Sequence, residues 1–335
     1  MARKGLSYLL GAVILIALMI LSTGYGSTAI PAPEVVQAVL LGLGLVDGDV
    51  GPMQRIVFDL RLPRALFAGV IGAGLGIVGV VLQTTTRNDL ADPFLFGLSS
   101  GAAAGAVFVI TVTGDILGFW TLPLAAFTGG ILASAIVLGL VHTLRTSAPE
   151  KLILAGLAVS FLFAAITNYL IFAGDSRAAH SVVFWMLGGL GLARWDSFPL
   201  VCAGLLLILA YAAYRARWLD ALLTGDVTAS TLGVPVQRLR FLMFFIAALA
   251  TAVFVSVAGV IGFIGLMVPH IARGIAGPLH RNLIPTAAIV GACLLTGSDI
   301  VSRVVLAPQE LPVGIVTTSI GALFVFVLLY RTARA

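Results

Sequence analysis

The sequence predicts an all-α polytopic membrane protein with about ten transmembrane helices, and two observations carry that prediction. The first is composition, because 60% of the 335 residues are hydrophobic and only 10% are charged, whereas soluble domains carry about 25% charged residues. The second is patterning, because long uncharged stretches of Gly, Ala, Val, Leu and Ile recur along the chain. About 20 such residues suffice for a helix to cross a bilayer core. We therefore expect one transmembrane domain over residues 1–335, in contact with membrane lipid.

The individual spans follow from the length of each apolar stretch and its lack of charge. They are expected at about 6–25, 63–83, 94–113, 121–142, 152–173, 198–214, 241–258, 260–275, 284–305 and 312–330. The first span follows Arg3 and Lys4 as a signal peptide would, but it has the length of a full span and lacks a compelling cleavage site, so we expect it to be retained.

Basic residues collect in the short loops that a cytoplasmic N-terminus would place inside. By the positive-inside rule, both termini are expected in the cytoplasm. The net charge of +5 then reflects topology, and no nucleic-acid partner is expected. Cys202 and Cys293 both lie in apolar stretches, which favours buried free thiols over a disulfide.

The second span and the loop after it form the most distinctive segment. Five glycines recur between residues 69 and 79; in a soluble helix each would cost about 1 kcal/mol, but between membrane helices small residues allow close approach. Asn88, Asp89 and Asp92 follow in a short polar loop, and Pro93 then suits the first turn of a returning helix. The pattern predicts two packed spans joined by a tight polar loop.

Two connecting segments carry structure of their own. Residues 26–59 read as an outer, periplasmic segment with a short helix near 34–43, and residues 174–195 read as an outer helix with an interfacial aromatic, Trp185. The inner loop 215–240 has an amphipathic helical pattern broken by two glycines, and Asp226 is expected to cap its second short helix. On these residues alone, docking on lipid headgroups and docking on a protein are equally supported.

Residues 259–275 contain Gly262, Gly265 and Pro269, which indicate a broken or closely packed helix. His270 beside them is either a ligand or proton carrier, or a histidine hydrogen-bonded within helix packing, and the second interpretation is favoured. Asp299 and Arg303 lie four residues apart near the outer end of a span. They can pair across one helical turn, and a charge at membrane depth is costly unless it is paired or functional.

Several catalytic and energy-coupling signatures are missing from the sequence. Its only lysines, Lys4 and Lys151, do not follow a Gly-rich loop, so a P-loop is excluded. No Cys/His cluster has metal-site spacing, and we expect neither cofactor nor catalytic site. A transporter of this kind must take its energy from another polypeptide.

Two alternatives remain open at this stage. An ion-driven secondary transporter would need intramembrane carboxylates, for which Asp299 is almost the only candidate. An integral-membrane enzyme would need a convergent polar cluster, for which Asn88, Asp89, Asp92 and His270 are the available residues.

Several ordered motifs resemble one known family. They are RLPRALFAGVIGAGLGIVGVVLQTTTRNDLADPFLFGLSSGA from residue 61, LGVPVQRLR (232–240), GVIGFIGLMVPHIAR (259–273), HRNLIP (280–285), residues 291–303 and ELPVGIVTTSIGALF (310–324). From about residue 55 to its end, the chain resembles the permease family of binding-protein-dependent ABC importers for iron–siderophore, haem and cobalamin.

The resemblance implies a subunit of two five-span halves in opposite orientation, since an odd number of spans inverts the second half. It also implies a homodimer in the bacterial inner membrane, two cytoplasmic ABC ATPase subunits and one periplasmic substrate-binding protein. Ferric siderophores are the commonest cargo of such relatives, followed by haem and cobalamin. Residues 146–151 (TSAPEK) depart from the hydroxyl-rich second gate segment of the cobalamin relative, which makes cobalamin a less attractive cargo.

The resemblance also assigns site residues. Arg61, Arg64 and Arg303 match positions that receive acidic residues of the binding protein, and Arg303 can serve this role and the ion pair together. The cytoplasmic gate matches Asn88 and Leu90. The ATPase-coupling element matches Gly225, Asp226, Ala229, Leu232 and Gly233, which favours protein docking for this loop. The motif at Gly262, Gly265, Pro269 and His270 is expected to be structural.

Overall fold

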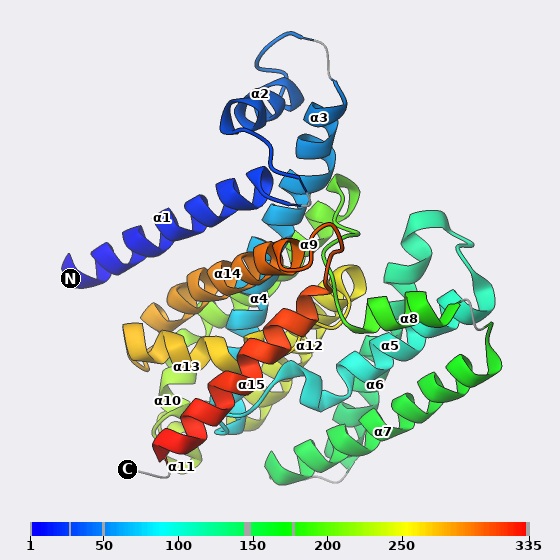
Figure 1. Cartoon of the computed structure of the whole chain (residues 1–335). Coiled ribbons are helices and arrows are strands. Elements are labelled where there is room, and N and C mark those ends of the chain that lie inside the picture. The colour runs from blue at the N-terminus through cyan, green and yellow to red at the C-terminus, as the bar shows by residue number, and fades with distance from the viewer. Residues whose placement is uncertain (1, 27, 49–50, 144–148, 176–177, 333–335) are drawn as a thin grey trace.

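The computed structural model describes residues 2–26, 28–48, 51–143, 149–175 and 178–332, and this part of the chain is helical without any strand (Figure 1). The long helices are α1 (Ala2–Gly24), α4 (Leu62–Thr86), α6 (Thr121–Thr143), α7 (Pro149–Ala173), α9 (Phe198–Tyr214), α12 (Val236–Ala258), α14 (His280–Val304) and α15 (Val313–Thr332). The shorter helices are α2 (Ala32–Gly42), α3 (Pro52–Arg55), α5 (Leu98–Phe108), α8 (Ala178–Met186), α10 (Ala216–Leu222), α11 (Asp226–Thr231) and α13 (Ile264–Ala276). A π-helical turn, Ile56–Arg61, joins α3 to α4, and another, Val109–Thr113, extends α5.

The helices account for the ten expected spans. Within the described residues, eight helices are long and apolar enough to cross a membrane, and two shorter apolar helices, Leu98–Thr113 and Ile264–Ala276, lie at the positions of the expected third and eighth spans. The boundary between the seventh and eighth spans lies at residues 259–263, between α12 and α13. Five spans precede α8 and five follow it, so the second half has the opposite orientation if each span crosses.

Helix α4 is the centre of the packing, and 89% of the residues in the 18-residue apolar stretch of this span are buried. It packs against α14, α13, α9 and α12. A Cβ built on Gly76 would lie 2.7 Å from the carbonyl oxygen of Ala287, and one built on Gly72 would meet Gly291 more closely still. The glycines of this span therefore permit helix contact at backbone distance, as the sequence predicts.

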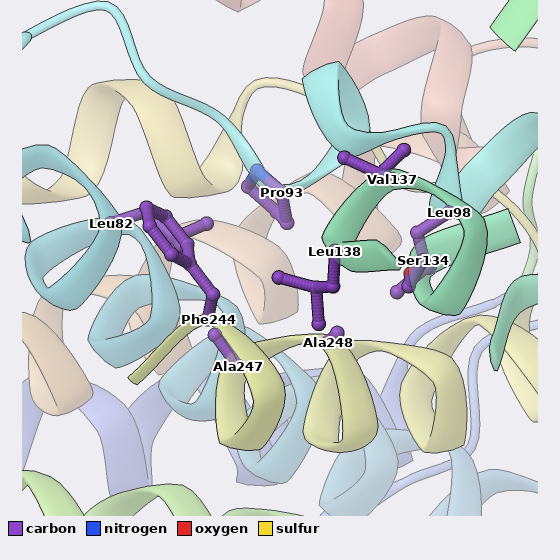
Figure 2. A pocket seen from close by; sticks show the side chains of 9 residues that line it. All are labelled: Leu82, Pro93, Leu98, Ser134, Val137, Leu138, Phe244, Ala247 and Ala248. Atoms are coloured by element: carbon purple, nitrogen blue, oxygen red, sulfur yellow. The ribbon is translucent and has the colours of Figure 1, made fainter. Parts of the chain in front are cut away.

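Helices α5, α6 and α7 form a second group, which joins the α4 group mainly through the packing of α6 and α5 on α12 (Figure 1). At this junction lies a small apolar pocket (Figure 2). Its lining residues are Leu82, Pro93, Leu98, Ser134, Val137, Leu138, Phe244, Ala247 and Ala248. The hydroxyl of Ser134, which lines this pocket, is buried without a hydrogen-bond partner within the described residues.

The two ends of the molecule differ. Helices α2 and α3 lie at one end and α10 and α11 at the other (Figure 1). Helix α2 confirms the short helix expected near 34–43, and α8 confirms the helix within 174–195. Trp185, however, is 8% exposed, so the prediction of an interfacial aromatic is wrong: the side chain packs into a core cluster with α5 and α12 residues.

Candidate functional site

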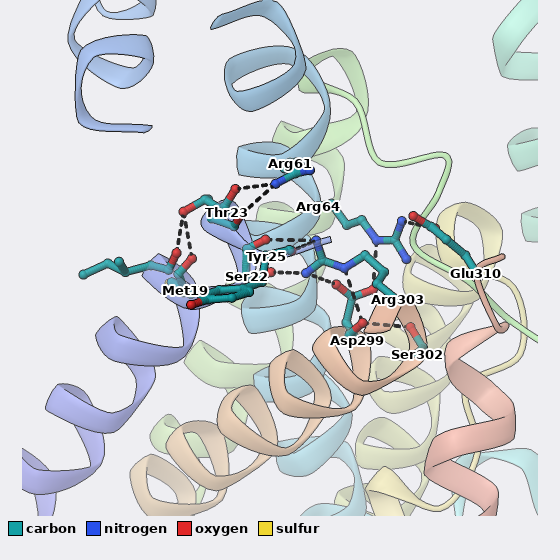
Figure 3. A network of polar contacts seen from close by, with 12 residues as sticks. Met19, Ser22, Thr23, Tyr25, Arg61, Arg64, Asp299, Ser302, Arg303 and Glu310 are labelled. Carbon is teal, nitrogen blue, oxygen red and sulfur yellow. Dashed lines mark hydrogen bonds and ion pairs between the residues drawn. The ribbon is translucent and has the colours of Figure 1, made fainter. Parts of the chain in front are cut away.

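Near the α2 end, three arginines gather around two carboxylates (Figure 3). Arg64 in α4 donates from Nε to Asp299 Oδ1 at 2.9 Å and from Nη1 to Glu310 Oε2 at 2.6 Å. Arg303 Nη2 lies 3.0 Å from Asp299 Oδ2, a close ionic contact without hydrogen-bond geometry. The Asp299–Arg303 pair expected from the sequence is therefore present, and Arg64 extends it.

Two of these arginines also cap the end of α1. Arg61 donates to the carbonyl oxygens of Gly24 at 3.0 Å and Thr28 at 2.6 Å. Arg303 donates to those of Ser22 at 2.9 Å and Tyr25 at 3.0 Å. Carbonyls in the last helical turn lack intrahelical partners, and a cation there also complements the helix dipole. The arginines thus fix α1 to α4 and α14.

The cluster leaves little of its charge accessible. Arg61 is 7% exposed and Arg303 is 2% exposed, while the side chains of Arg64 and Glu310 are 13% and 42% exposed. Three positive and two negative side chains leave a net charge of one positive unit. Any attraction for an acidic partner would therefore act through Arg64 and through the field of the buried groups.

The loop of residues 87–92, which we call the gate loop because it contains both expected gate residues, begins where α4 ends. Arg87 adopts a left-handed conformation with φ of 52°, which stops the helix. The side chain of Asn88 accepts a hydrogen bond from the Leu90 amide at 2.9 Å, a local turn that leaves Leu90 50% exposed. Of the two expected gate residues, Asn88 therefore stabilises the turn of this loop, and Leu90 lies exposed on it.

Asp92 closes the gate loop. Its Oδ1 accepts from the Phe94 amide at 2.9 Å and caps the short 3₁₀ turn Pro93–Phe96, whereas Oδ2 is buried without a partner. Burial opposes ionisation and raises the pKa of Asp92 to about 6, and the Phe94 hydrogen bond only partly offsets this.

The gate loop is followed by a close contact with α13. A Cβ on Gly265 would lie 2.9 Å from Pro93 Cδ, so the close packing expected at this glycine is present. Pro269 lies inside α13, and Gly262 lies in the turn before it with open space around its Cα. His270 is exposed, with its ring 5.5 Å from that of Phe324. The structure gives its imidazole no hydrogen bond among the described residues, so the expected hydrogen-bonded burial is not found.

The last turn of α4 is held by side chains from three other helices. Arg273 in α13 donates to Gln83 Oε1 at 2.8 Å and to Asp89 Oδ1 at 3.1 Å. In α14, His280 Nε2 lies 2.9 Å from Thr84 Oγ1. In α12, Arg240 Nε donates to the Thr85 carbonyl at 2.8 Å.

Two of these residues, His280 and Arg240, also bind the short helices of the inner loop. His280 Nδ1 lies 2.7 Å from Asp220 Oδ1 in α10, and the His280 amide donates to the same oxygen at 2.8 Å. Arg240 donates from Nη1 and Nη2 to both carboxylate oxygens of Asp226 in α11, at 2.8 and 2.9 Å. The bidentate form is the strongest geometry for such a pair.

This arrangement corrects one sequence prediction. Gly225, with φ of 106°, is the N-cap of α11, and Asp226 is its first helical residue without a capping hydrogen bond. The Asp226 carboxylate is turned to Arg240 instead. Among the other residues of the coupling element, Ala229 is fully buried and Leu232 is 67% exposed, while Gly233 has φ of 82° and ends the helix pair.

Asp220, His280 and Thr84 have the order of a carboxylate–imidazole–hydroxyl triad, but the site cannot act as one. His280 is fully buried and Thr84 is 4% exposed, so a substrate has no access to the hydroxyl. Within the described residues, no group of three or more His, Cys, Asp or Glu side chains could hold a metal ion. The polar network holds the end of α4 in place against the neighbouring helices.

Comparison with known proteins identifies the family. Residues 14–331 match the FecCD transport family. The chain belongs to that family. A cobalamin import system permease protein of Halobacterium salinarum is 38% identical to this FecCD protein over 91% of this chain and 80% of its own. An Fe(3+)-citrate import system permease protein of Bacillus subtilis is 35% identical over 99% and 97% of the two chains, and a hemin transport system permease protein of Yersinia pestis is 36% identical over 83% and 84%.

A solved structure, described as an inward-facing conformation of a putative metal-chelate type ABC transporter, shares the fold of this FecCD protein. Its TM-score is 0.81 at 30% identity, with 97% of this chain and 98% of that chain covered. The relatives are ABC transporter permeases, and the chain is accordingly a multi-pass transport protein rather than an enzyme.

Sequence reasoning missed the residues that tie the gate loop to the inner loop. Asp220, His280 and Arg240 come from three segments far apart in the chain, and nothing in their local spacing indicates that they meet. His280 lies in HRNLIP and Arg240 lies in LGVPVQRLR, so these motifs are a signal for two of the three residues.

Proposed function

We propose that this chain is the permease subunit of an iron-chelate importer, most consistently a ferric-siderophore importer, with haem or cobalamin as the alternative cargo. A separate ATPase subunit supplies the energy. The observation that carries the proposal is the helix pair α10–α11, which lies at one end of the molecule and presents exposed apolar side chains, with Val227 81% and Leu232 67% exposed. A surface of this kind fits a groove on a protein partner.

The cargo class rests on the relatives. The names of three of them refer to cobalamin, ferric citrate and hemin, which are all bulky metal chelates. Spans built from small and aliphatic residues can pass such a ligand without gripping it, so affinity would reside in a periplasmic binding protein.

The assembly that follows has a second copy of this permease, two cytoplasmic ABC ATPase subunits and one periplasmic binding protein in a bacterial inner membrane. Both termini and α10–α11 lie in the cytoplasm, and residues 26–59 lie in the periplasm. In this orientation Asn88 and Leu90 belong to the cytoplasmic gate. Gly225, Asp226, Ala229, Leu232 and Gly233 belong to the element that couples to the ATPase.

The cargo and the energy source are tested together by reconstitution. The permease and its ATPase, in vesicles with the binding protein outside, should accumulate a ferric siderophore when ATP is enclosed. Haem and cobalamin serve as competing cargoes and would replace the siderophore as the assigned substrate if either alone accumulated. Accumulation by the permease alone, driven by a proton or sodium gradient, would instead establish the secondary transporter.

We further propose that the surface around Arg64, with Arg61 and Arg303 behind it, receives acidic residues of the binding protein. Opposite charge raises encounter rates and fixes register. Arg64→Gln should reduce stimulation of ATPase activity by the binding protein, and the effect of the wild-type charge should fade at high salt. The matched control is Arg194→Gln, an arginine that is 58% exposed and outside the cluster. Equal stimulation in the two variants would contradict docking at this surface.

A further inference from the structure

The last turn of α4 is the only part of that helix with direct polar bonds to side chains that also bind α10 and α11 in the described structure. Thr84 and Thr85 are adjacent, and each meets a different intermediary: the Thr84 hydroxyl meets His280, and the Thr85 carbonyl meets Arg240. Both intermediaries are buried, His280 completely and Arg240 to 8% exposure. Water therefore does not compete for these bonds, and they are stronger than surface bonds of the same length.

Each intermediary has a carboxylate of the helix pair on its far side. Asp220 in α10 binds His280 through both the ring and the backbone amide, so it also caps the first turn of α14. Asp226 in α11 binds Arg240 through both oxygens. A bidentate ion pair fixes orientation as well as distance, so a rotation of α11 must turn the guanidinium with it.

Helix α11 packs on α10 and α12, and α10 itself packs on α4. The Arg240 side chain adds a direct polar connection from α11 to the end of α4, because it bonds to Asp226 and to the Thr85 carbonyl. The gate loop starts two residues beyond Thr85, and its Asp89 is held from the other side by Arg273. A movement of Arg240 would thus displace the Thr85 carbonyl, which lies just before Arg87, the residue at which α4 ends.

We propose that Asp220–His280–Thr84 and Asp226–Arg240–Thr85 are two side-chain links that transmit movement of α10–α11 to the gate loop. This inference rests on the proposed function, because it takes α10–α11 as the element that a separate ATPase moves. His280 and Arg240 are positioning residues. They set the position of the end of α4.

The sharpest variant removes one hydroxyl. Thr84→Val keeps the shape of the side chain and deletes only its bond to His280. Thr86→Val is the matched control, since Thr86 is in the same turn, is 3% exposed, and bonds only to Leu82 of its own helix. Thr84→Ser restores a hydroxyl and should rescue what Thr84→Val loses.

The readout is the amount of cargo imported per ATP hydrolysed by the reconstituted complex. Thr84→Val should lower this ratio by about fivefold, a factor typical of losing one buried hydrogen bond. Thr86→Val and Thr84→Ser should keep the wild-type ratio. A role in stability alone would reduce import and hydrolysis together, through loss of folded complex, and would leave the ratio unchanged.

The second link is tested by Arg240→Gln, with Arg238→Gln, an exposed arginine two residues away on the same helix, as its control. A spin label at Leu90 should report an ATP-dependent movement in the wild type and in the Arg238 variant, but a reduced one in the Arg240 variant. A label at Val227 should move equally in all three.

The outcomes separate this inference from the proposed function. If wild-type import is ATP-driven and Thr84→Val has the wild-type ratio, or if the Leu90 label moves normally in Arg240→Gln, the links do not transmit movement and the inference is overturned. If the wild-type permease neither binds nor stimulates an ABC ATPase, the proposed function fails, and the inference fails with it.

Discussion

Substitution of Gly291 by alanine tests whether the centre of the molecule depends on backbone contact between α4 and α14. A Cβ on Gly291 would lie 2.9 Å from the carbonyl carbon of Gly72 and closer still to its oxygen. Ordinary carbon–carbon contacts in proteins are about 3.5–4.0 Å. The two helices would therefore have to separate by roughly 0.5–1 Å, in the most buried part of the chain.

The cost of that separation is that of overpacking a core, about 1–3 kcal/mol. The same helix offers a control, because a Cβ on Gly297 would have open space around it. Gly297→Ala should be neutral or stabilising by up to about 1 kcal/mol, the difference in helix propensity between the two residues. Gly291 lies in the same helix and gains the same propensity, so the two variants are expected to differ by the cost of overpacking alone, about 1–3 kcal/mol.

The assay is thermal unfolding of the purified protein in detergent, followed by tryptophan fluorescence. Gly291→Ala should unfold at a lower temperature than the wild type, and Gly297→Ala should not. An unchanged midpoint for Gly291→Ala would refute the claim that α4 and α14 require contact at backbone distance.

Three further predictions concern charge and surface. Arg303→Gln leaves Asp299 buried with Arg64 as its remaining partner and should lower the free energy of unfolding by about 3 kcal/mol, whereas Arg194→Gln should change it little; equal stability of the two variants would contradict the capping role. Asp92 has a pKa of about 6 in the folded protein against the ordinary 3.8, so the folded state binds the proton more tightly and stability falls as pH rises through 6. Asp92→Asn should remove that fall, about 3 kcal/mol by pH 8, and a pH profile of unfolding like that of the wild type would count against it. Val227→Glu should weaken binding of the ATPase subunit without changing thermal stability, because this side chain is 81% exposed; undiminished binding would argue against α11 as the docking element.

The fold could be predicted from sequence because each span is decided locally. About twenty apolar residues leave a helix little alternative in a bilayer, and breakers such as Gly259 and Pro93 mark where helices end. The short α13 was recognisable for the same reason, although its start at Ile264 required the three-dimensional turn around Phe263, whose φ is 67°.

The candidate site could be predicted only where it is local. Asp299 and Arg303 are one turn apart, and the Asx turn of Asn88 lies within three residues. The capping of α1 by Arg61 and Arg303 was not predictable, because the acceptors are backbone carbonyls that no side-chain pattern marks. The misassigned cap at Asp226 has the same origin: a distant arginine, Arg240, competes for the carboxylate and makes two charged hydrogen bonds instead of one cap.

The helix pair α4–α14 is fixed at three levels, which limits how the protein can move. Arg64 binds Asp299 at one end at 2.9 Å, the backbones touch in the middle, and Thr84 lies 2.9 Å from His280 at the other end. We therefore expect the two helices to move together.

The junction of α5–α7 with α12 contains the apolar pocket (Figure 2). We therefore expect alternating access to arise from movement of α5–α7 against the α4–α14 pair, with the gate loop as the hinge between them. Cysteines at Leu138 and Phe244, which face the pocket from α6 and α12, provide the test in a background free of Cys202 and Cys293. Joining them with a short bifunctional reagent should stop import while the unlinked double variant remains active, and import by the cross-linked protein would show that the junction does not open.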